Sequence, residues 1–235
     1  MRVIAGCVPW GVTAAMLLAG AGAAQPTAQA ERPQPGSAPV IWSIDSLVTI
    51  GGQHVTIAGS PRVVETPEGK AIEFNGASDG VFVENNPLAG LDRFTIEVVF
   101  SPAADGSEEQ RFVHIEETGT GNRALIELRM LPGAAWCLDS FLRHGDASLT
   151  LIDRAKIHPS ASWHVAALSF DGQTMAHYVD RVRQGSGGVA FKPLGPGRTS
   201  IGVRQNLVSW FKGRVRLMRI TPAVVPTADL LRVSK

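Results

Sequence analysis

Residues 163–180, WHVAALSFDGQTMAHYVD, constrain the fold more than any other stretch of the sequence. Side chains alternate between two faces with a period of two on either side of Asp171 and Gly172. A period of two is that of a β-strand, and glycine tolerates the positive φ that a tight connection between two strands needs. This stretch therefore predicts an antiparallel hairpin.

Short apolar runs separated by turn residues recur along the rest of the chain. Residues 94–100, FTIEVVF, alternate most cleanly, and Pro102 ends the run. No long run has a helical period, and residues 227–231 predict only one short helical turn. Many short strands between turns predict an all-β fold, a two-sheet antiparallel jelly-roll sandwich. The other expected strands are 40–42, 54–57, 62–65, 71–74, 81–83, 111–117, 123–130, 136–143, 148–153, 199–204 and 211–221.

The N-terminus has the parts of an export signal. Arg2 precedes an apolar run over residues 11–24, and small residues follow it. The run is shorter than the roughly 20 residues that a membrane-spanning helix needs. We predict a cleaved signal peptide over 1–30, a Pro-rich tether over 31–39, and one domain over 40–235. The mature chain would then be secreted or periplasmic, and a retained N-terminal anchor is the alternative.

The charge of the mature chain argues against two classes of partner. Without Arg2, 21 basic residues face 21 acidic ones, because the predicted signal peptide contains no acid. Proteins that bind nucleic acids carry a clear basic excess, and so do surfaces that bind anionic membranes. We therefore expect no nucleic-acid partner and no membrane insertion of the mature chain.

Several landmarks occur in the order found in one known family. They are AIEFNG at 71–76, FTIEVVF at 94–100, WHVA at 163–166, YVD at 178–180, SIG at 200–202 and FKGRV at 211–215. This order resembles the laminin-G-like domains of the concanavalin A-like lectin/glucanase superfamily. The resemblance implies two antiparallel sheets, one of them concave, with saccharides held on the concave sheet.

The sequence departs from the family pattern at two places. Arg181 follows Asp180 where the family usually has glycine, and Arg216 stands where an aspartate that often helps a calcium site is usual. Calcium prefers carboxylate and carbonyl oxygens, so a cationic Arg216 argues against calcium at that place. No cofactor is predicted, with calcium elsewhere as the open alternative.

Charged residues and histidines recur at alternate positions of the middle strands. Arg123, Glu127 and Arg129 share a face with Leu125, and we expect this face to line an open hollow. His114 is expected to share a face with Phe112. The residues expected to bind a ligand are Glu97, His114, Glu127, Arg129 and Asp139, with Trp136 or Trp210 stacking on a sugar ring.

Three functions remain open at this point. The leading one is an exported module that binds a carbohydrate or another extracellular ligand. The first alternative is a polysaccharide-cleaving enzyme, a hydrolase or a lyase, in which Glu97 or Glu127 works with His114 as acid and base. The second is an adhesive or structural domain that binds protein, in which the charged side chains form cross-strand ion pairs on a wet surface.

Overall fold

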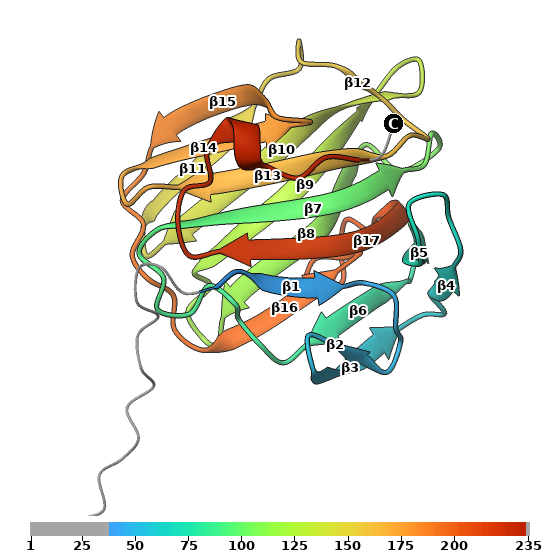
Figure 1. Cartoon of the computed structure of the whole chain (residues 1–235), viewed down its shortest axis with the longest axis horizontal. Helices are drawn as coiled ribbons and strands as arrows, with labels where there is room; N and C mark the ends of the chain where they lie inside the picture. Colours follow the sequence, from blue (N-terminus) through green and yellow to red (C-terminus); the bar gives the residue numbers. More distant parts are fainter. Residues whose placement is uncertain (1–37, 234–235) are drawn as a thin grey trace, which may run out of the picture. The chain divides into compact units, whose positions relative to one another are not determined.

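The structure, a computed structural model, describes residues 38–233 (Figure 1). The predicted signal peptide over 1–30 and most of the predicted tether lie outside the described residues. Within the described part, no helix is long and apolar enough to cross a membrane.

Two antiparallel sheets form the sandwich, as predicted. In the first, eight-stranded sheet the order is β15-β14-β13-β7-β17-β5-β4, and β1 also pairs with β17. Its strands are β1 (Val40–Ser43), β4 (Arg62–Val64), β5 (Ala71–Asn75), β7 (Phe94–Pro102), β13 (His164–Phe170), β14 (Thr174–Val179), β15 (Val182–Gly188) and β17 (Lys212–Thr221).

The second, nine-stranded sheet has the order β11-β10-β9-β8-β16-β6-β3-β2, and β12 also pairs with β10. Its strands are β2 (Thr49–Ile50), β3 (Gln53–Ala58), β6 (Gly80–Val83), β8 (Glu109–Glu117), β9 (Arg123–Leu131), β10 (Ala135–His144), β11 (Ala147–Ile152), β12 (His158–Pro159) and β16 (Gly197–Ile201). One 3-10 turn, η1 (Thr227–Asp229), follows β17, where the sequence predicts a helical turn.

The predicted hairpin is confirmed as β13 and β14. Phe170 pairs with Met175 across the turn. Asp171 Oδ1 accepts hydrogen bonds from the amides of Gln173 (2.9 Å) and Thr174 (2.7 Å), and Gly172 has a φ of 103°. Asp171 therefore closes the turn, and Gly172 supplies the residue in the left-handed region, as the sequence pattern predicts.

The apolar core fills the space between the sheets. Phe94, Ile96, Val98 and Phe100 of β7 point into it from the first sheet. Alternate residues of β9, among them Ile126 and Leu128, meet them from the second sheet. Because successive strand residues point to opposite faces, the intervening residues lie on the two outer faces of the sandwich.

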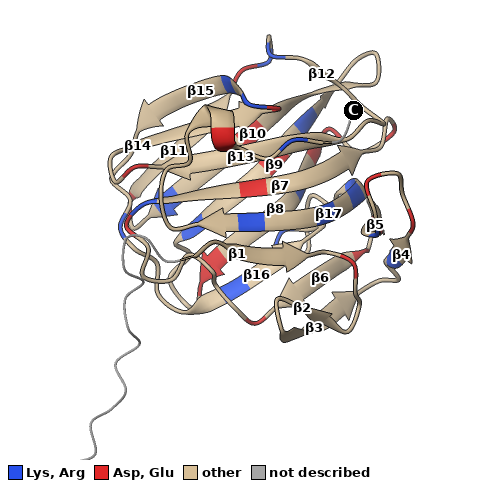
Figure 2. Ribbon diagram, in the orientation of Figure 1, with Lys and Arg blue, Asp and Glu red and all other residues tan. Residues whose placement is uncertain are grey.

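The C-terminal segment covers part of the outer face of the first sheet (Figure 1). Glu97 on β7 is buried there, and its carboxylate accepts hydrogen bonds from Arg219 Nε (2.5 Å) and the Leu231 amide (2.6 Å). Figure 2 shows acidic colouring on β7 and basic colouring on the neighbouring β17, the two strands that this ion pair joins. Arg181 donates to the carbonyls of Ala228 and Leu230.

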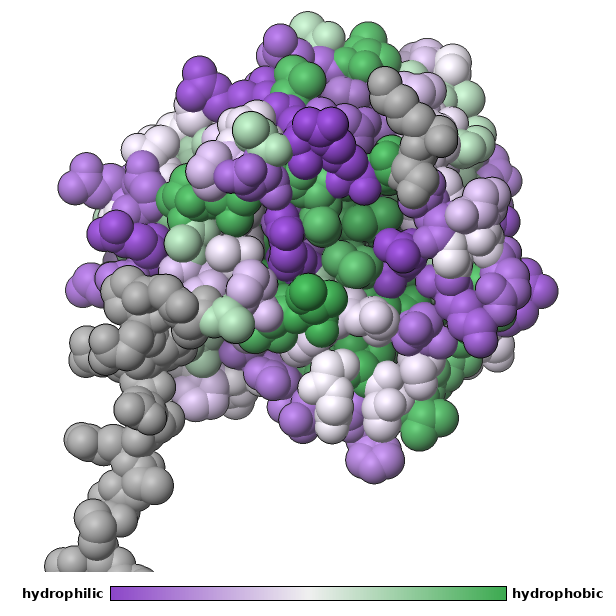
Figure 3. Space-filling view, viewed as in Figure 1, coloured by the Kyte–Doolittle hydropathy of each residue, from purple (hydrophilic) through white to green (hydrophobic). Residues whose placement is uncertain are grey.

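Figure 3 views the molecule from this covered side, where hydrophilic and apolar residues are intermixed. Glu97 and Arg181 both form hydrogen bonds with the backbone of the C-terminal segment. Their charged groups therefore already have partners within the protein. The outer face of the second sheet, with its row of charged side chains, is the other face available to a ligand.

Candidate functional site

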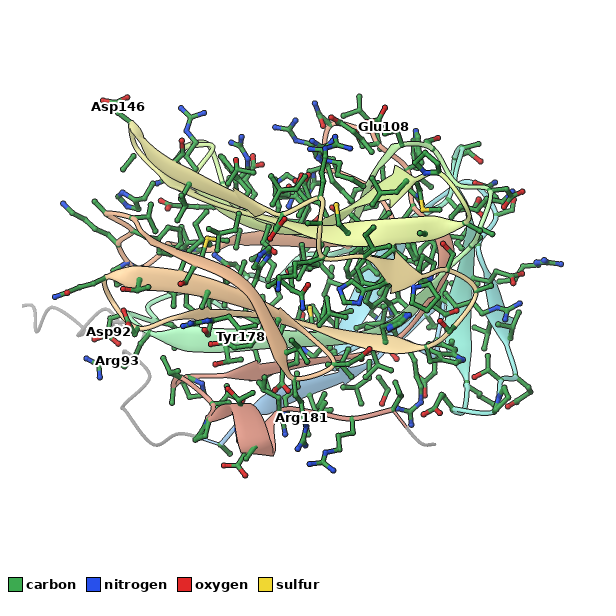
Figure 4. All side chains as sticks on the ribbon, turned by 90° about the horizontal axis from the view of Figure 1, so that it is seen from above. Asp92, Arg93, Glu108, Asp146, Tyr178 and Arg181 are labelled. Atoms are coloured by element: carbon green, nitrogen blue, oxygen red, sulfur yellow. The ribbon has the colours of Figure 1, made fainter. Side chains whose placement is uncertain are left out.

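A hollow of about 190 Å³ lies on the outer face of the nine-stranded sheet. Its lining comes from β8, β9, β10 and β11 and from the loop between β16 and β17. The lining residues are Arg111, Arg123, Leu125, Glu127, Arg129, Asp139, Phe141, Thr150 and Arg204. Asp146 and Glu108 rise above this sheet on the side opposite Arg181 (Figure 4).

The alternation of β9 creates most of this lining. Arg123, Leu125, Glu127 and Arg129 all border the hollow, while the residues between them enter the core. The sequence-based expectation that these alternate positions face an open hollow is therefore confirmed. Glu127 pairs directly with Asp139 on β10, which brings two carboxylates from adjacent strands to one place.

A β-bulge in β8 adds a residue that the sequence pattern missed. The register of β8 against β9 shifts between Arg111 and Val113. Phe112 and Val113 consequently both enter the core, and Arg111 faces outward opposite Glu127. The expectation that His114 shares a face with Phe112 was wrong, because the extra residue of a bulge reverses the alternation.

Ion pairs tie the acidic and basic side chains of the hollow together. Arg129 Nε donates to Asp139 Oδ2 (2.7 Å), and Arg111 Nε lies 3.1 Å from Glu127 Oε1. Glu109 contacts both arginines. The side chains of Glu127 and Asp139 are only 4% and 1% exposed. Their geometry is therefore fixed by the arginines before any ligand arrives.

Burial changes the proton affinity of both carboxyl groups. Burial, and then the charge of Asp139, raise the pKa of Glu127 to about 7, although Arg111 and Arg129 oppose the change. Burial also raises the pKa of Asp139 against the opposing charge of Arg129. The hollow therefore becomes more positive as the pH falls through about 7.

The raised pKa of Glu127 predicts a pH-dependent stability. Between about pH 4.5 and 7 the folded protein keeps a proton that the unfolded chain releases, so the free energy of unfolding falls as the pH rises through this window. The fall attributable to Glu127 is at most about 3 kcal/mol. Urea unfolding at pH 5 and pH 8 should show a smaller fall in Glu127→Gln than in wild type.

The control is Glu108→Gln, since Glu108 has a side chain that is 70% exposed. This variant should keep the wild-type pH dependence. An unchanged difference between the two pH values in Glu127→Gln would contradict the assignment.

Two of the predicted ligand residues do not reach the hollow. Glu97 lies in the other sheet beneath the C-terminal segment. His114 is on the correct face, but it is 1% exposed, accepts the Gln205 amide at Nδ1 (3.0 Å) and lies 2.8 Å from Glu116. The expectation that Glu97 and His114 share one cleft with Glu127 was therefore wrong. A period of two predicts which residues share a face of a strand, but it does not predict which sheet the strand joins or whether other segments cover that face.

The two predicted stacking residues, Trp136 and Trp210, differ in how deeply they are buried. Trp136 is fully buried, donates from Nε1 to the Pro159 carbonyl (3.0 Å) and packs edge-on against Phe100. The expectation that Trp136 stacks on a sugar ring was therefore wrong, because its ring belongs to the core. Trp210 is half-buried and follows Ser209, whose carbonyl accepts the Arg111 amide (2.9 Å). A role for Trp210 in stacking stays a prediction.

A Ser–His–Asp constellation occurs away from the hollow. His164 Nδ1 lies 2.7 Å from Asp180 Oδ2, and His164 Nε2 lies 2.9 Å from Ser162 Oγ. The Pro159 carbonyl is also 2.9 Å from Nε2. Ser162 Oγ also donates to this carbonyl (3.2 Å), His164 is buried, and neither side chain lines one of the two hollows. The arrangement therefore ties the 159–164 segment to the hairpin.

A second, larger cavity of about 700 Å³ lies beside β5, the start of β17 and the end of β7. Its charged side chains largely pair with one another: Glu73 contacts both Arg62 (2.7 Å) and Arg214 (2.9 Å). Asp79 accepts the amides of Ser60 (2.8 Å) and Asn75 (3.0 Å). The charged side chains that line this cavity therefore bind to other parts of the protein and hold the neighbouring loops in place.

No group of three or more potential metal ligands among histidine, cysteine, aspartate and glutamate occurs in the described residues.

The order of the strands in the two sheets defines this protein as an antiparallel β-sandwich. A family model described as the concanavalin A-like lectin/glucanases superfamily matches residues 75–230. The chain therefore belongs to this superfamily, in its laminin-G branch. No curated protein sequence matches it.

Solved structures with this fold include domain 4 of AbnA, an extracellular arabinanase from Geobacillus stearothermophilus, in complex with arabinotriose. It is 19% identical, with a TM-score of 0.60, over 80% of this chain and 94% of that one. A sialidase CBM40 from Ruminococcus gnavus bound to sialyllactose is 17% identical, with a TM-score of 0.56, over 68% and 94%. A pentraxin from Limulus polyphemus is 14% identical, with a TM-score of 0.53, over 67% and 77%.

Proposed function

We propose that this protein is an exported carbohydrate-binding module that holds a saccharide in the hollow of the nine-stranded sheet. The observation that carries the proposal is the hollow itself, in which β8, β9 and β10 present fixed charged groups on the face opposite the C-terminal segment. Charged side chains suit sugar hydroxyls because they give or accept hydrogen bonds in defined directions.

Ion pairing prepares the hollow for binding. Arg111 and Arg129 hold their side chains against Glu127 and Asp139, so little side-chain freedom is lost when a ligand arrives. The superfamily resemblance and the two oligosaccharide-bound neighbours support a saccharide as the ligand. The volume of about 190 Å³ is below the roughly 300–1,000 Å³ of pockets for drug-sized ligands, which suits a short saccharide or a chain end.

Binding is favoured over cleavage by the state of the carboxylates. A general acid must come within hydrogen-bond reach of the bond that it protonates. The side chains of Glu127 and Asp139 are both nearly inaccessible, so neither carboxyl group can reach a glycosidic bond from its present position. We therefore place their role in shaping the site. Export through the predicted signal peptide would bring the module to extracellular or periplasmic saccharides.

A blocking substitution tests the site. Thr150 is exposed and lines the hollow, and Ser148 is exposed on the same strand but outside the lining. Calorimetry against a panel of oligosaccharides should show wild-type binding that Thr150→Trp weakens at least about tenfold, or about 1.4 kcal/mol. Ser148→Trp should bind as wild type does. Equal binding by both variants, or no binding by wild type up to millimolar saccharide, would refute the proposal.

A further inference from the structure

We propose that the saccharide is acidic and that Arg123 and Arg204 bind its carboxylate at one side of the hollow. This inference rests on the proposed function and specifies the chemical class of the ligand. It starts from an imbalance: Arg111 and Arg129 have carboxylate partners in the hollow, whereas Arg123 and Arg204 have no ion pair among the described residues.

Arg123 is held in place without a direct ion pair in the described structure, although the charge of Glu116 acts on it. Its Nη1 donates to the Gly121 carbonyl (2.8 Å), and its guanidinium carbon lies 4.9 Å from the centre of the Phe141 ring. Its Nε is buried without a hydrogen-bond partner in the described structure. The cross-strand neighbour Glu116 lies against His114 instead (2.8 Å). The carbonyl and the aromatic ring orient the guanidinium and leave donors for an anion.

Arg204 reaches the hollow from the loop between β16 and β17. Its backbone is fixed in a turn, since its amide donates to the Val208 carbonyl (3.3 Å) and its carbonyl accepts the Leu207 amide (2.8 Å). Its side chain lines the same hollow as Arg123. Burial and then the charge of Arg204 lower the pKa of Arg123, and the charge of Glu116 opposes them, in keeping with two cations that line one hollow.

An anion between these two arginines would relieve that repulsion. Among the residues that line the hollow, arginines also exceed carboxylates, four against two. They are Arg111, Arg123, Arg129 and Arg204 against Glu127 and Asp139. The excess grows when Glu127 takes up its proton near pH 7. A planar guanidinium fork matches a carboxylate with two parallel hydrogen bonds, which is the anionic group of uronic and sialic acids.

Matched pairs of saccharides test the inference by calorimetry. The probes are trigalacturonate with its methyl ester, sialyllactose with lactose, and sulfated lactose with lactose. We expect at least one carboxylated probe to bind about tenfold or more tightly than its neutral partner. Arg123→Gln and Arg204→Gln should each remove about tenfold of its affinity. Neither arginine has a direct ion pair among the described residues, so both variants should keep the wild-type circular dichroism. Arg183→Gln, a change on exposed β15 in the other sheet, is the control and should bind as wild type does.

Each contrary outcome has a separate meaning. If neutral probes bind as tightly as carboxylated ones and Thr150→Trp still weakens them, the acidic ligand is refuted and the carbohydrate-binding function stands. If sulfated lactose binds and the carboxylated probes do not, the carboxylate assignment is overturned. If no probe binds wild type, the proposed function fails together with this inference.

Discussion

Arg129→Met should lower the free energy of unfolding by about 3–5 kcal/mol, because it leaves a buried carboxylate without its partner. Arg129 contacts Asp139 Oδ2 through Nε (2.7 Å) and Nη2 (2.6 Å), and Asp139 is 1% exposed. The other oxygen, Asp139 Oδ1, is buried without a hydrogen-bond partner in the described structure. Urea unfolding monitored by circular dichroism measures the loss.

The double variant Arg129→Met/Asp139→Leu is the matched control. It removes both charges and keeps apolar volume at the site, so it should recover most of the stability that Arg129→Met loses. A double variant no more stable than Arg129→Met would contradict the explanation, because the loss would then come from packing of the Arg129 stem.

Trp136→Ala should cost about 3–5 kcal/mol by leaving a cavity in the core. The ring is fully buried, contacts Phe100 at a centroid distance of 5.2 Å and donates to the Pro159 carbonyl. Trp210→Ala should cost clearly less, since Trp210 is half-buried. Thermal unfolding of the two variants compares them directly, and equal losses would place both rings in the same environment, against this structure.

The fold could be predicted because its elements have strong local signals. The turn at Asp171 and Gly172 and the alternation of β7 and β9 identify strands from local chemistry alone. The strand β15 was missed, since Val182–Gly188 is rich in glycine and has weak β propensity. It forms because pairing with β14 and the turn at Asp180 and Arg181, both at positive φ, bring it into the sheet.

The site could be predicted only along one strand. Alternation gives the faces of β9 residues correctly, so Glu127 and Arg129 were found, and Asp139 followed by the same parity. Arg111 was missed because the β8 bulge shifts its face, and Arg204 because it enters from a loop. Glu97 was misplaced because its sheet depends on long-range pairing, which the local sequence does not encode.

The structure of a complex with the tightest-binding saccharide of the panel tests the central claim most directly. We expect the sugar on the outer face of the nine-stranded sheet, in contact with β8, β9 and β10 and with Arg123 and Arg204. A sugar bound in the larger cavity beside β5 and β17, with the hollow unchanged, would contradict it.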